Sequence, residues 1–281
     1  MNKLSTEQRA KIIGCLVEGM SIRATVRITG TAKNTITKLL VDIGQACADY
    51  QDQTLRGLSC KRIECDELWS FCYAKKKNVP EELKGLFGYG DVWTWTAICS
   101  ESKLVPSWLV ANRSEEAAKM FIDDLASRLD HHIQITTDGY KAYIEAIGEA
   151  FGYDIDYAVL VKMYGDDNPN SKNPDKKYSP GSFTGSKTQK IYGRPDMNRV
   201  STSIAERNNL TMCMSMRRFT RLTNGFSKKV TNLEAAVALH FMYYNFGRIH
   251  TSLRVTPAME AGVSDHVWSL EEIAGLLEKI A

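Results

Sequence analysis

The spacing of apolar residues divides the chain into a helical beginning, a strand-rich middle and a helical end. Apolar residues within 12–17 recur at helical spacing, and two further short helices are expected on either side of the Thr29-Gly30 turn. Three short helices with a glycine-containing turn before the third are typical of a helix-turn-helix. We therefore predict an all-α helix-turn-helix domain over residues 1–45, followed by a helix tail and linker over 46–60.

The middle of the chain changes to short runs of aromatic, β-branched and other apolar residues, as in strands. Three such runs follow closely on one another at 62–73, 92–99 and 104–110, which predicts an antiparallel meander. After them we expect a helix at 114–125, a strand at 133–137, a helix at 140–151 and a strand at 157–161. This order is that of α/β proteins with a ribonuclease-H-like fold, in which helices flank a mixed sheet.

The remaining third of the chain is expected to hold a loop and then helices. Residues 165–199 are dominated by Asn, Pro, Gly, Ser, Asp and Lys, which predicts a long loop insertion. A helix is expected from 202 to 224, because this stretch lacks Gly and Pro, and another at about 231–249. The apolar face of the first of these helices consists of Ala205, Met212, Met216 and Phe219. These elements complete a predicted core over 61–250, and a C-terminal helical tail follows over 251–281.

Charge is unevenly distributed along the chain, although the formal net charge is only +3. Residues 187–229 contain ten Lys and Arg against two acids, Asp196 and Glu206, which leaves +8 in this segment (10 − 2). A basic block of this kind is typical of proteins that bind a polyanion, usually DNA or RNA. The alternative is a solvated surface whose charge is balanced by acids nearby in space. The residues expected to hold nucleic acid phosphates are Arg217, Arg218, Arg221, Lys228 and Lys229.

The third predicted helix carries a second set of candidate DNA-binding residues. In a helix-turn-helix the first turn of the last helix meets base edges in DNA. Here the hydrogen-bond donors in that position suit both bases and phosphates. They are Lys33, Asn34 and Thr35, with Lys38 one turn further on. The alternative is a small helical domain that binds another protein, and we favour DNA binding.

Cysteine usage and hydropathy indicate where the protein works. The seven cysteines show neither a C-x-x-C motif nor a repeating spacing. An odd number without a framework indicates a reducing compartment and argues against a disulfide scaffold or a zinc module. No signal peptide is expected, and no apolar run approaches membrane-spanning length. We therefore expect a cytoplasmic protein that has no membrane partner.

Three acids occupy the positions from which carboxylates converge in a ribonuclease-H-like fold. Asp66 lies in the first predicted strand, Asp138 ends the fourth, and Glu206 lies in the late helix. Each acid alone is more often a surface group. Glu64 is the strongest rival of Asp66 because it lies on the same face of the strand, whereas Glu67 is expected to point to the opposite face.

Converging carboxylates without a His or Cys suit magnesium. Mg²⁺ prefers carboxylate oxygens, water and substrate phosphate as its ligands. Two such ions about 3.5–4 Å apart activate the attacking oxygen and stabilise the leaving oxygen in phosphodiester cleavage. We therefore predict that Asp66, Asp138 and Glu206 are the catalytic residues and hold two Mg²⁺ ions, for which Mn²⁺ substitutes.

Long blocks of this sequence resemble the IS1 family of bacterial insertion-sequence transposases. The resemblance covers nearly the whole chain from about residue 5, and it implies a DDE transposase with a ribonuclease-H-like catalytic core. By motif position it also assigns catalytic metal binding to Asp66, Asp138 and Glu206. Many relatives carry a Cys-rich zinc ribbon before the helix-turn-helix, and this sequence shows no such ribbon. The blocks are CDELWSF (65–71), GDVWTWTA (90–97), TDGYKAY (137–143), ERNNLTM (206–212), MSMRRFTRLTN (214–224) and ALHFMYYNF (238–246).

The resemblance implies a specific activity and set of partners. We expect metal-dependent cleavage at the ends of an insertion sequence, followed by strand transfer into target DNA. The expected partners are the terminal inverted repeats and the target DNA, and a homodimer or larger homo-oligomer is expected because two DNA ends must be held together. The alternatives are a nuclease of the same fold, which cuts without joining, and a DNA-binding regulator whose core is not catalytic.

Overall fold

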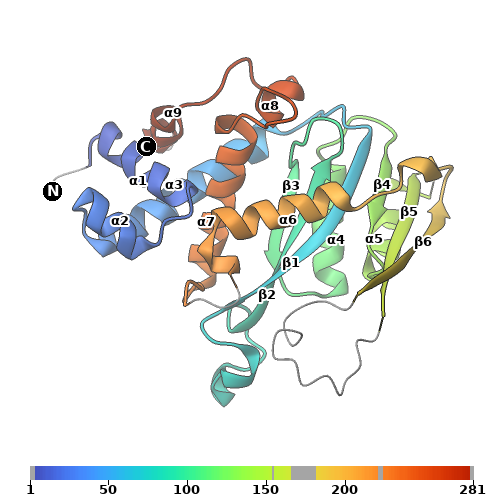
Figure 1. Cartoon of the computed structure of the whole chain (residues 1–281), viewed down its shortest axis with the longest axis horizontal. Coiled ribbons are helices and arrows are strands. Elements are labelled where there is room, and N and C mark those ends of the chain that lie inside the picture. The colour runs from blue at the N-terminus through green and yellow to red at the C-terminus, as the bar shows by residue number, and fades with distance from the viewer. Residues whose placement is uncertain (1–3, 154, 166–181, 221–223, 279–281) are drawn as a thin grey trace.

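A six-stranded mixed sheet forms the centre of the molecule in this computed structural model (Figure 1). The structure describes residues 4–153, 155–165, 182–220 and 224–278. The strands are β1 (Arg62–Cys72), β2 (Gly90–Cys99), β3 (Ser107–Ala111), β4 (Gln134–Thr137), β5 (Asp156–Tyr164) and β6 (Phe183–Tyr192). Their spatial order is β3-β2-β1-β4-β5-β6, with β1, β4 and β5 parallel and the other neighbours antiparallel. This mixed sheet flanked by helices is compatible with the predicted ribonuclease-H-like fold.

The pairing between β1 and β4 ends early, and this opens the sheet where the candidate acids lie. The register runs from Arg62 opposite Gln134 to Glu64 opposite Thr136. Extending it by two residues brings Asp66 opposite Asp138, just beyond the last paired residues. The carboxyl ends of parallel strands are where sites form in open α/β sheets, because the chain leaves the sheet there.

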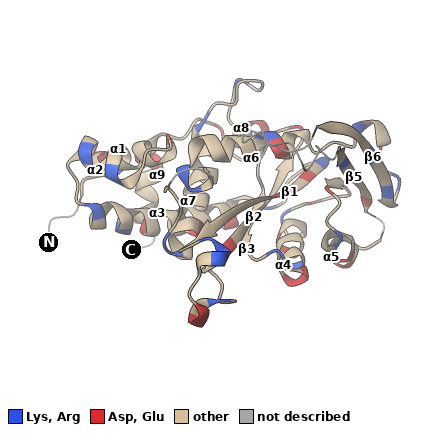
Figure 2. Cartoon of the chain, turned by 60° about the horizontal axis from the view of Figure 1, so that its bottom comes forward, with Lys and Arg blue, Asp and Glu red and all other residues tan. Residues whose placement is uncertain are grey.

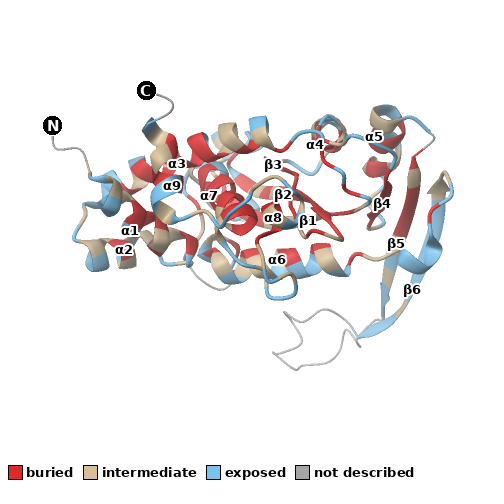
Figure 3. Cartoon of the chain, turned by 90° about the horizontal axis from the view of Figure 1, so that it is seen from above, coloured by how far each residue is buried: buried red, intermediate tan, exposed pale blue. Residues whose placement is uncertain are grey.

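Helices cover both faces of the sheet. The helices α4 (Glu115–Ala126) and α5 (Ala142–Phe151) lie on one face, and α6 (Ser203–Ser215) lies on the other, as the view in Figure 3 shows. As predicted, α4 begins with a capping residue, Ser114, whose side chain accepts a hydrogen bond from the Ala117 N–H. Its buried residues fall at helical spacing, which turns its apolar face to the sheet.

A second group of helices packs at the end of the sheet that carries β2 and β3. It comprises α1 (Thr6–Val17), α2 (Ile22–Thr29), α3 (Lys33–Thr54), α7 (Val230–Met242), α8 (Pro257–Glu260) and α9 (Leu270–Gly275). Ile13 on α1 and Ile43 on α3 belong to the same buried cluster as the residues of the sheet. The helices α3 and α7 cross closely at Gly44, where an added Cβ would lie 2.5 Å from the Cα of Ala235. Glycine is required there because any side chain would push the two helices apart.

The stretch 46–60, predicted to be a helix tail and linker, is helical to Thr54, so the helix takes up most of it. One side of this stretch is buried against α7. Cys47 is fully buried, and the Gln51 side-chain amide donates to the carbonyl of Ala238 at 3.2 Å.

The predicted loop at 165–199 is wrong in its second half, which contains β6. This strand pairs antiparallel with β5, from Tyr157 opposite Tyr192 to Tyr164 opposite Phe183. It is the edge strand, and most of its side chains are exposed. Its sequence is therefore polar and lacks the apolar alternation by which a half-buried strand is recognised. Residues 166–181 lie outside the described part of the chain.

The two late helices are confirmed, but their ends differ from the prediction. The helix α6 stops at Ser215, Met216 is extended, and a short 3-10 turn, Arg217–Phe219, follows. The four residues predicted to form one apolar face are all buried nonetheless. The other helix, α7, continues beyond Met242 as a π-helical turn, Tyr243–Gly247. Among the described residues, we find no helix whose length and hydropathy would let it cross a membrane.

Candidate active site

Three carboxylates meet at the opening between β1 and β4. Asp66 and Glu67 come from β1, and Asp138 follows the last residue of β4. Each offers an oxygen, and these oxygens all lie within 4.8 Å of one another, close enough to share a metal ion. Among the described residues, this is the one group of three or more Asp, Glu, His or Cys side chains whose ligand atoms lie this close together. We refer to it below as the carboxylate cluster.

Asp66 is the carboxylate that the fold holds most firmly. Its Oδ1 accepts a hydrogen bond from the N–H of Glu67 at 2.8 Å, and its Oδ2 accepts one from the side-chain amide of Asn209 at 2.8 Å. Burial, together with the negative charges of Glu67, Asp138 and Glu206, raises the pKa of Asp66 to about 7. A cation at this position would therefore favour the ionised carboxylate.

Asp138 is fixed by its own backbone turn. Its Oδ1 accepts a hydrogen bond from the N–H of Tyr140 at 2.9 Å, and its Oδ2 lies 3.8 Å from a guanidinium nitrogen of Arg113. Its side chain is 40% exposed. The carboxylate is thus oriented toward the cluster and still open to solvent.

Glu67 is the member of the cluster that the sequence did not predict. Its side chain is only 1% exposed, and its Oε2 accepts a hydrogen bond from Arg113 Nε at 3.1 Å and forms an ion pair with Arg113 Nη2 at 3.0 Å. The Arg113 guanidinium in turn lies 4.0 Å from the ring centre of Tyr140 and 4.9 Å from that of Trp93. Burial raises the pKa of Glu67. The Tyr143 hydroxyl interacts with this carboxylate and lowers its pKa in part.

The alternation of a strand explains why Glu67 was missed. It does leave β1 on the opposite side from Asp66, toward Arg113 and α5, as expected from strand geometry. Because β1 has no partner beyond Glu64 on the β4 side, the carboxylate of Glu67 nonetheless comes close to those of Asp66 and Asp138. Neither spacing nor residue type in the sequence signals the early end of this pairing.

Glu206 lies at the same edge of the sheet but outside the carboxylate cluster. Both its oxygens accept hydrogen bonds from the ammonium group of Lys162 on β5, at 2.5 and 2.6 Å, and its Oε1 also accepts one from the Thr202 hydroxyl. Its side chain is 44% exposed. One turn later on α6, Asn209 reaches Asp66, and the charge of Glu206 contributes to the raised pKa of Asp66. The helix therefore carries Glu206 to the site, while Lys162 holds its carboxylate.

Glu64, the rival of Asp66, has a different role. It is buried, and its Oε2 accepts hydrogen bonds from the N–H groups of Ile204 and Ala205 at 2.8 and 3.0 Å. The capping position of α6, Thr202, forms no side-chain cap of its own. Glu64 thus supplies from β1 the acceptor that the first turn of α6 needs, although burial raises its pKa.

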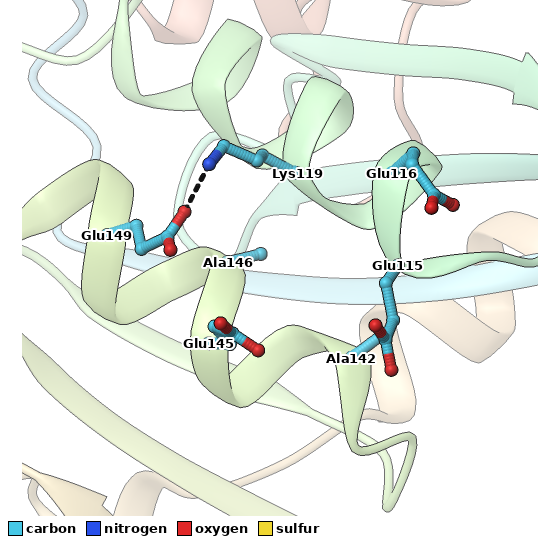
Figure 4. A pocket seen from close by; sticks show the side chains of 7 residues that line it. All are labelled: Glu115, Glu116, Lys119, Ala142, Glu145, Ala146 and Glu149. Carbon is cyan, nitrogen blue, oxygen red and sulfur yellow. Dashed lines mark hydrogen bonds and ion pairs between the residues drawn. The ribbon is translucent and has the colours of Figure 1, made fainter.

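The carboxylate cluster fits a hard divalent cation. Its donors are all carboxylate oxygens, and burial raises the pKa of both Asp66 and Glu67, so a positive charge between them would compensate their negative charges. A separate hollow between α4 and α5 is lined mainly by glutamates, with Lys119 bound to Glu149 (Figure 4). Its lining residues include no member of the carboxylate cluster.

The predicted DNA-binding residues differ in their availability. On α3, Lys33, Asn34 and Thr35 are exposed, whereas Lys38 forms an ion pair with Asp42 at 2.5 Å. These residues remain candidates by their position in the first turns of the helix.

The basic residues predicted to bind phosphates between 217 and 229 also differ in how exposed they are. Arg217 and Lys229 are exposed, and the Lys228 ammonium lies 3.8 Å from the ring centre of Phe226. Arg218 is partly buried, donates to the Ser227 hydroxyl at 2.7 Å, and has a pKa lowered by burial, so it serves the packing of this segment. Arg221 lies outside the described residues.

Comparison with known proteins adds no assignment to these observations. No protein-family model matches the chain, and the curated proteins contain no match to it. The case for function therefore depends on the geometry of the site and on the motifs in the sequence.

Proposed function

We propose that this protein is a DNA transposase of the DDE type. The observation that carries the proposal is the carboxylate cluster at the opening between β1 and β4, with α6 bringing Glu206 to the same edge. The mixed sheet and the sequence blocks that resemble the IS1 family support it as well. The activity would be cleavage at the ends of a mobile element and transfer of those ends into target DNA.

Each residue of the site would have a distinct role in cleavage and strand transfer. Asp66 and Asp138, with Glu206 or Glu67, would hold Mg²⁺, which supplies a Lewis acid for the attacking and leaving oxygens of a phosphodiester. Asn209 and the backbone of Glu67 would hold the Asp66 carboxylate in place to bind that cation. In the first step the oxygen of water attacks phosphorus and the element's 3′-oxygen leaves. In the second step that 3′-hydroxyl attacks a target phosphodiester and another 3′-oxygen leaves.

The partners follow from the chemistry of two DNA ends. The first turn of α3, with Lys33, Asn34 and Thr35, would contact the terminal repeats of the element. Because two ends must be joined to one target, the protein would act as a homodimer or a larger homo-oligomer. The proposed place of action is the cytoplasm, where DNA and Mg²⁺ are both available.

The test is strand transfer by Asp138→Asn, which keeps the shape of the side chain and removes its charge. Purified protein would be incubated with a pre-cleaved element end, a plasmid target and Mg²⁺ or Mn²⁺. We expect joined product from the wild type and none from the variant. The matched control is Asp130→Asn, an exposed acid at the other end of β4, which should join DNA as the wild type does.

Three outcomes would contradict the proposal. Full joining by Asp138→Asn would remove the carboxylate cluster from the mechanism. Cleaved but never joined DNA would indicate a nuclease of the same fold. DNA binding with a regulatory effect that persists in chelator, and no cleavage under any condition, would indicate a regulator.

A further inference from the structure

The chain between β1 and β2, residues 73–89, extends beyond the sheet at the end where β1 finishes (Figure 1). We call it the β1–β2 projection. Its base is anchored, because Val79 is buried and Gly88 lies against Val230, where an added Cβ would come within 3.0 Å of the side chain. The projection is therefore a fixed part of the surface at its base.

A segment from much later in the chain lies against this base. The N–H of Tyr73 donates to the carbonyl of Ser227 at 2.9 Å, and the rings of Phe71 and Phe226 are 4.6 Å apart. Arg217 belongs to the same region, since an added Cβ on Gly225 would lie 2.7 Å from the Arg217 carbonyl oxygen. Two chain segments far apart in the sequence thus form one continuous surface.

This surface concentrates exposed positive side chains that form no ion pair in the described part of the chain. We call it the basic surface, and it consists of Lys75, Lys76, Lys77, Arg217, Lys228 and Lys229, all exposed. Within the described part of the chain none of the six forms an ion pair, although many other Lys and Arg do, such as Lys38, Arg62 and Lys162. Figure 2 shows blue segments where the projection leaves the sheet.

Acids on the neighbouring elements reduce this charge without cancelling it. At the tip of the projection Glu81 is bound to Lys84, so this pair contributes no net charge. Glu82, Asp91 and Glu234 form no ion pair in the described residues. Even if all three faced the basic surface, a net charge of +3 (6 − 3) would remain.

The position of the basic surface relative to the carboxylate cluster indicates what it binds. Cys72, where β1 ends, is six residues beyond Asp66, which is about 20 Å along a strand at about 3.3 Å per residue. Since one base pair of B-DNA rises about 3.4 Å, a duplex along β1 would present phosphates to the surface about six base pairs from the cluster. Flexible, unpaired lysines suit the phosphates of a backbone because they need no fixed base geometry.

We propose that the basic surface binds the phosphate backbone of duplex DNA on one side of the bond on which the carboxylate cluster acts. The location of that bond rests on the proposed function, whereas the binding itself requires neither metal nor catalysis. The surface supplies affinity and orientation, and it reads no base sequence.

The experiment compares two triple variants of the full chain that lose the same charge. One is Lys75→Gln, Lys76→Gln, Lys77→Gln in the projection. The control is Lys11→Gln, Lys61→Gln, Lys119→Gln, which are exposed and lie on α1, before β1 and on α4. Binding to a fluorescent duplex of about three helical turns is measured by anisotropy, in chelator, over a series of salt concentrations. Thermal unfolding confirms that both variants are folded.

We expect the projection variant to lose affinity about tenfold or more near 0.1 M salt. Its slope of log affinity against log salt should be smaller by about 2.7, because about 0.9 is lost for each of three phosphate contacts. The control should keep the wild-type slope. Equal slopes for the two variants would overturn the proposal, and so would an equal loss of binding to single-stranded DNA or to anionic lipid vesicles, which would indicate nonspecific attraction of anions.

This outcome is independent of the test of the proposed function. Asp138→Asn should bind the duplex with the wild-type salt slope even though it joins no DNA. If Asp138→Asn joins DNA normally while the projection variant loses binding, the proposed function is wrong but the proposal that the basic surface binds DNA is supported. If strand transfer depends on Asp138 while both triple variants bind DNA alike, the proposal about the basic surface is wrong but the proposed function is supported.

Discussion

The acids at the opening of the sheet are supported in two different ways. Asp66 and Asp138 are held by backbone N–H groups of their own strand or turn, and Glu67 is buried against Arg113. Glu206 stands on a helix, is 44% exposed, and has a lysine as its main partner. The first group is in place without any ligand, because the strands determine its geometry. The position of the helix acid instead depends on a charged contact that a phosphate or a metal ion could replace.

The largest effect on stability is expected for the carboxylates held by the strands, where Glu67 is buried against Arg113. Arg113→Met leaves Glu67 buried without its cation, so we expect the free energy of unfolding to fall by about 3 kcal/mol, the low end for breaking a buried pair because Arg113 is partly exposed. Urea unfolding in chelator measures this. The double variant Arg113→Met, Glu67→Gln should recover most of the loss, since the buried charge is then absent. An undiminished stability of Arg113→Met would show that the strand carboxylates do not depend on Arg113.

A smaller effect is expected where the two regions are joined. Glu64→Ala removes the acceptor from the first turn of α6, and we expect a loss of about 1–2 kcal/mol in the free energy of unfolding. Amide hydrogen exchange of residues 204 and 205 should become faster. Glu64→Gln is the matched control. It keeps an acceptor, and burial disfavours the charge that it removes, so most of the stability should remain. Equal losses for both variants would indicate that the charge itself is needed.

The smallest effect on stability is expected on the helix side. Lys162→Met breaks an ion pair that is largely solvated, so the free energy of unfolding should change by less than about 1 kcal/mol. The affinity for Mn²⁺, measured by calorimetry, should nonetheless rise by less than about tenfold, because Glu206 is released and one positive charge is removed from the site. Lys187→Met on β6, an exposed lysine, is the control and should leave the affinity unchanged. A weaker affinity in Lys162→Met would mean that Lys162 positions Glu206 for the metal.

The sequence predicted the arrangement of the sheet because apolar runs in buried strands are distinctive. β1, β2 and α4 were all expected close to where they lie, and the strand order places Asp66 beside Asp138. It did not predict β6, because an exposed edge strand carries no apolar alternation. It predicted a helix tail after residue 45 but not how far α3 continues, because the buried side of this stretch becomes apparent only when α7 packs on it. Glu67 and Arg113 were missed for a related reason. Their contact depends on where two strands stop pairing, which is a tertiary property that residue spacing does not express.

The length of α3 has a consequence for how DNA could be measured along the protein. It is one uninterrupted helix of 22 residues, or about 33 Å at about 1.5 Å per residue, and its second half is clamped to α7 through Gly44. A duplex recognised at the exposed first turn would therefore sit at a set distance from the opening between β1 and β4. Because α3 is rigid, it would fix the number of base pairs between the recognised sequence and the cleaved bond. Inserting base pairs between them should therefore prevent cleavage.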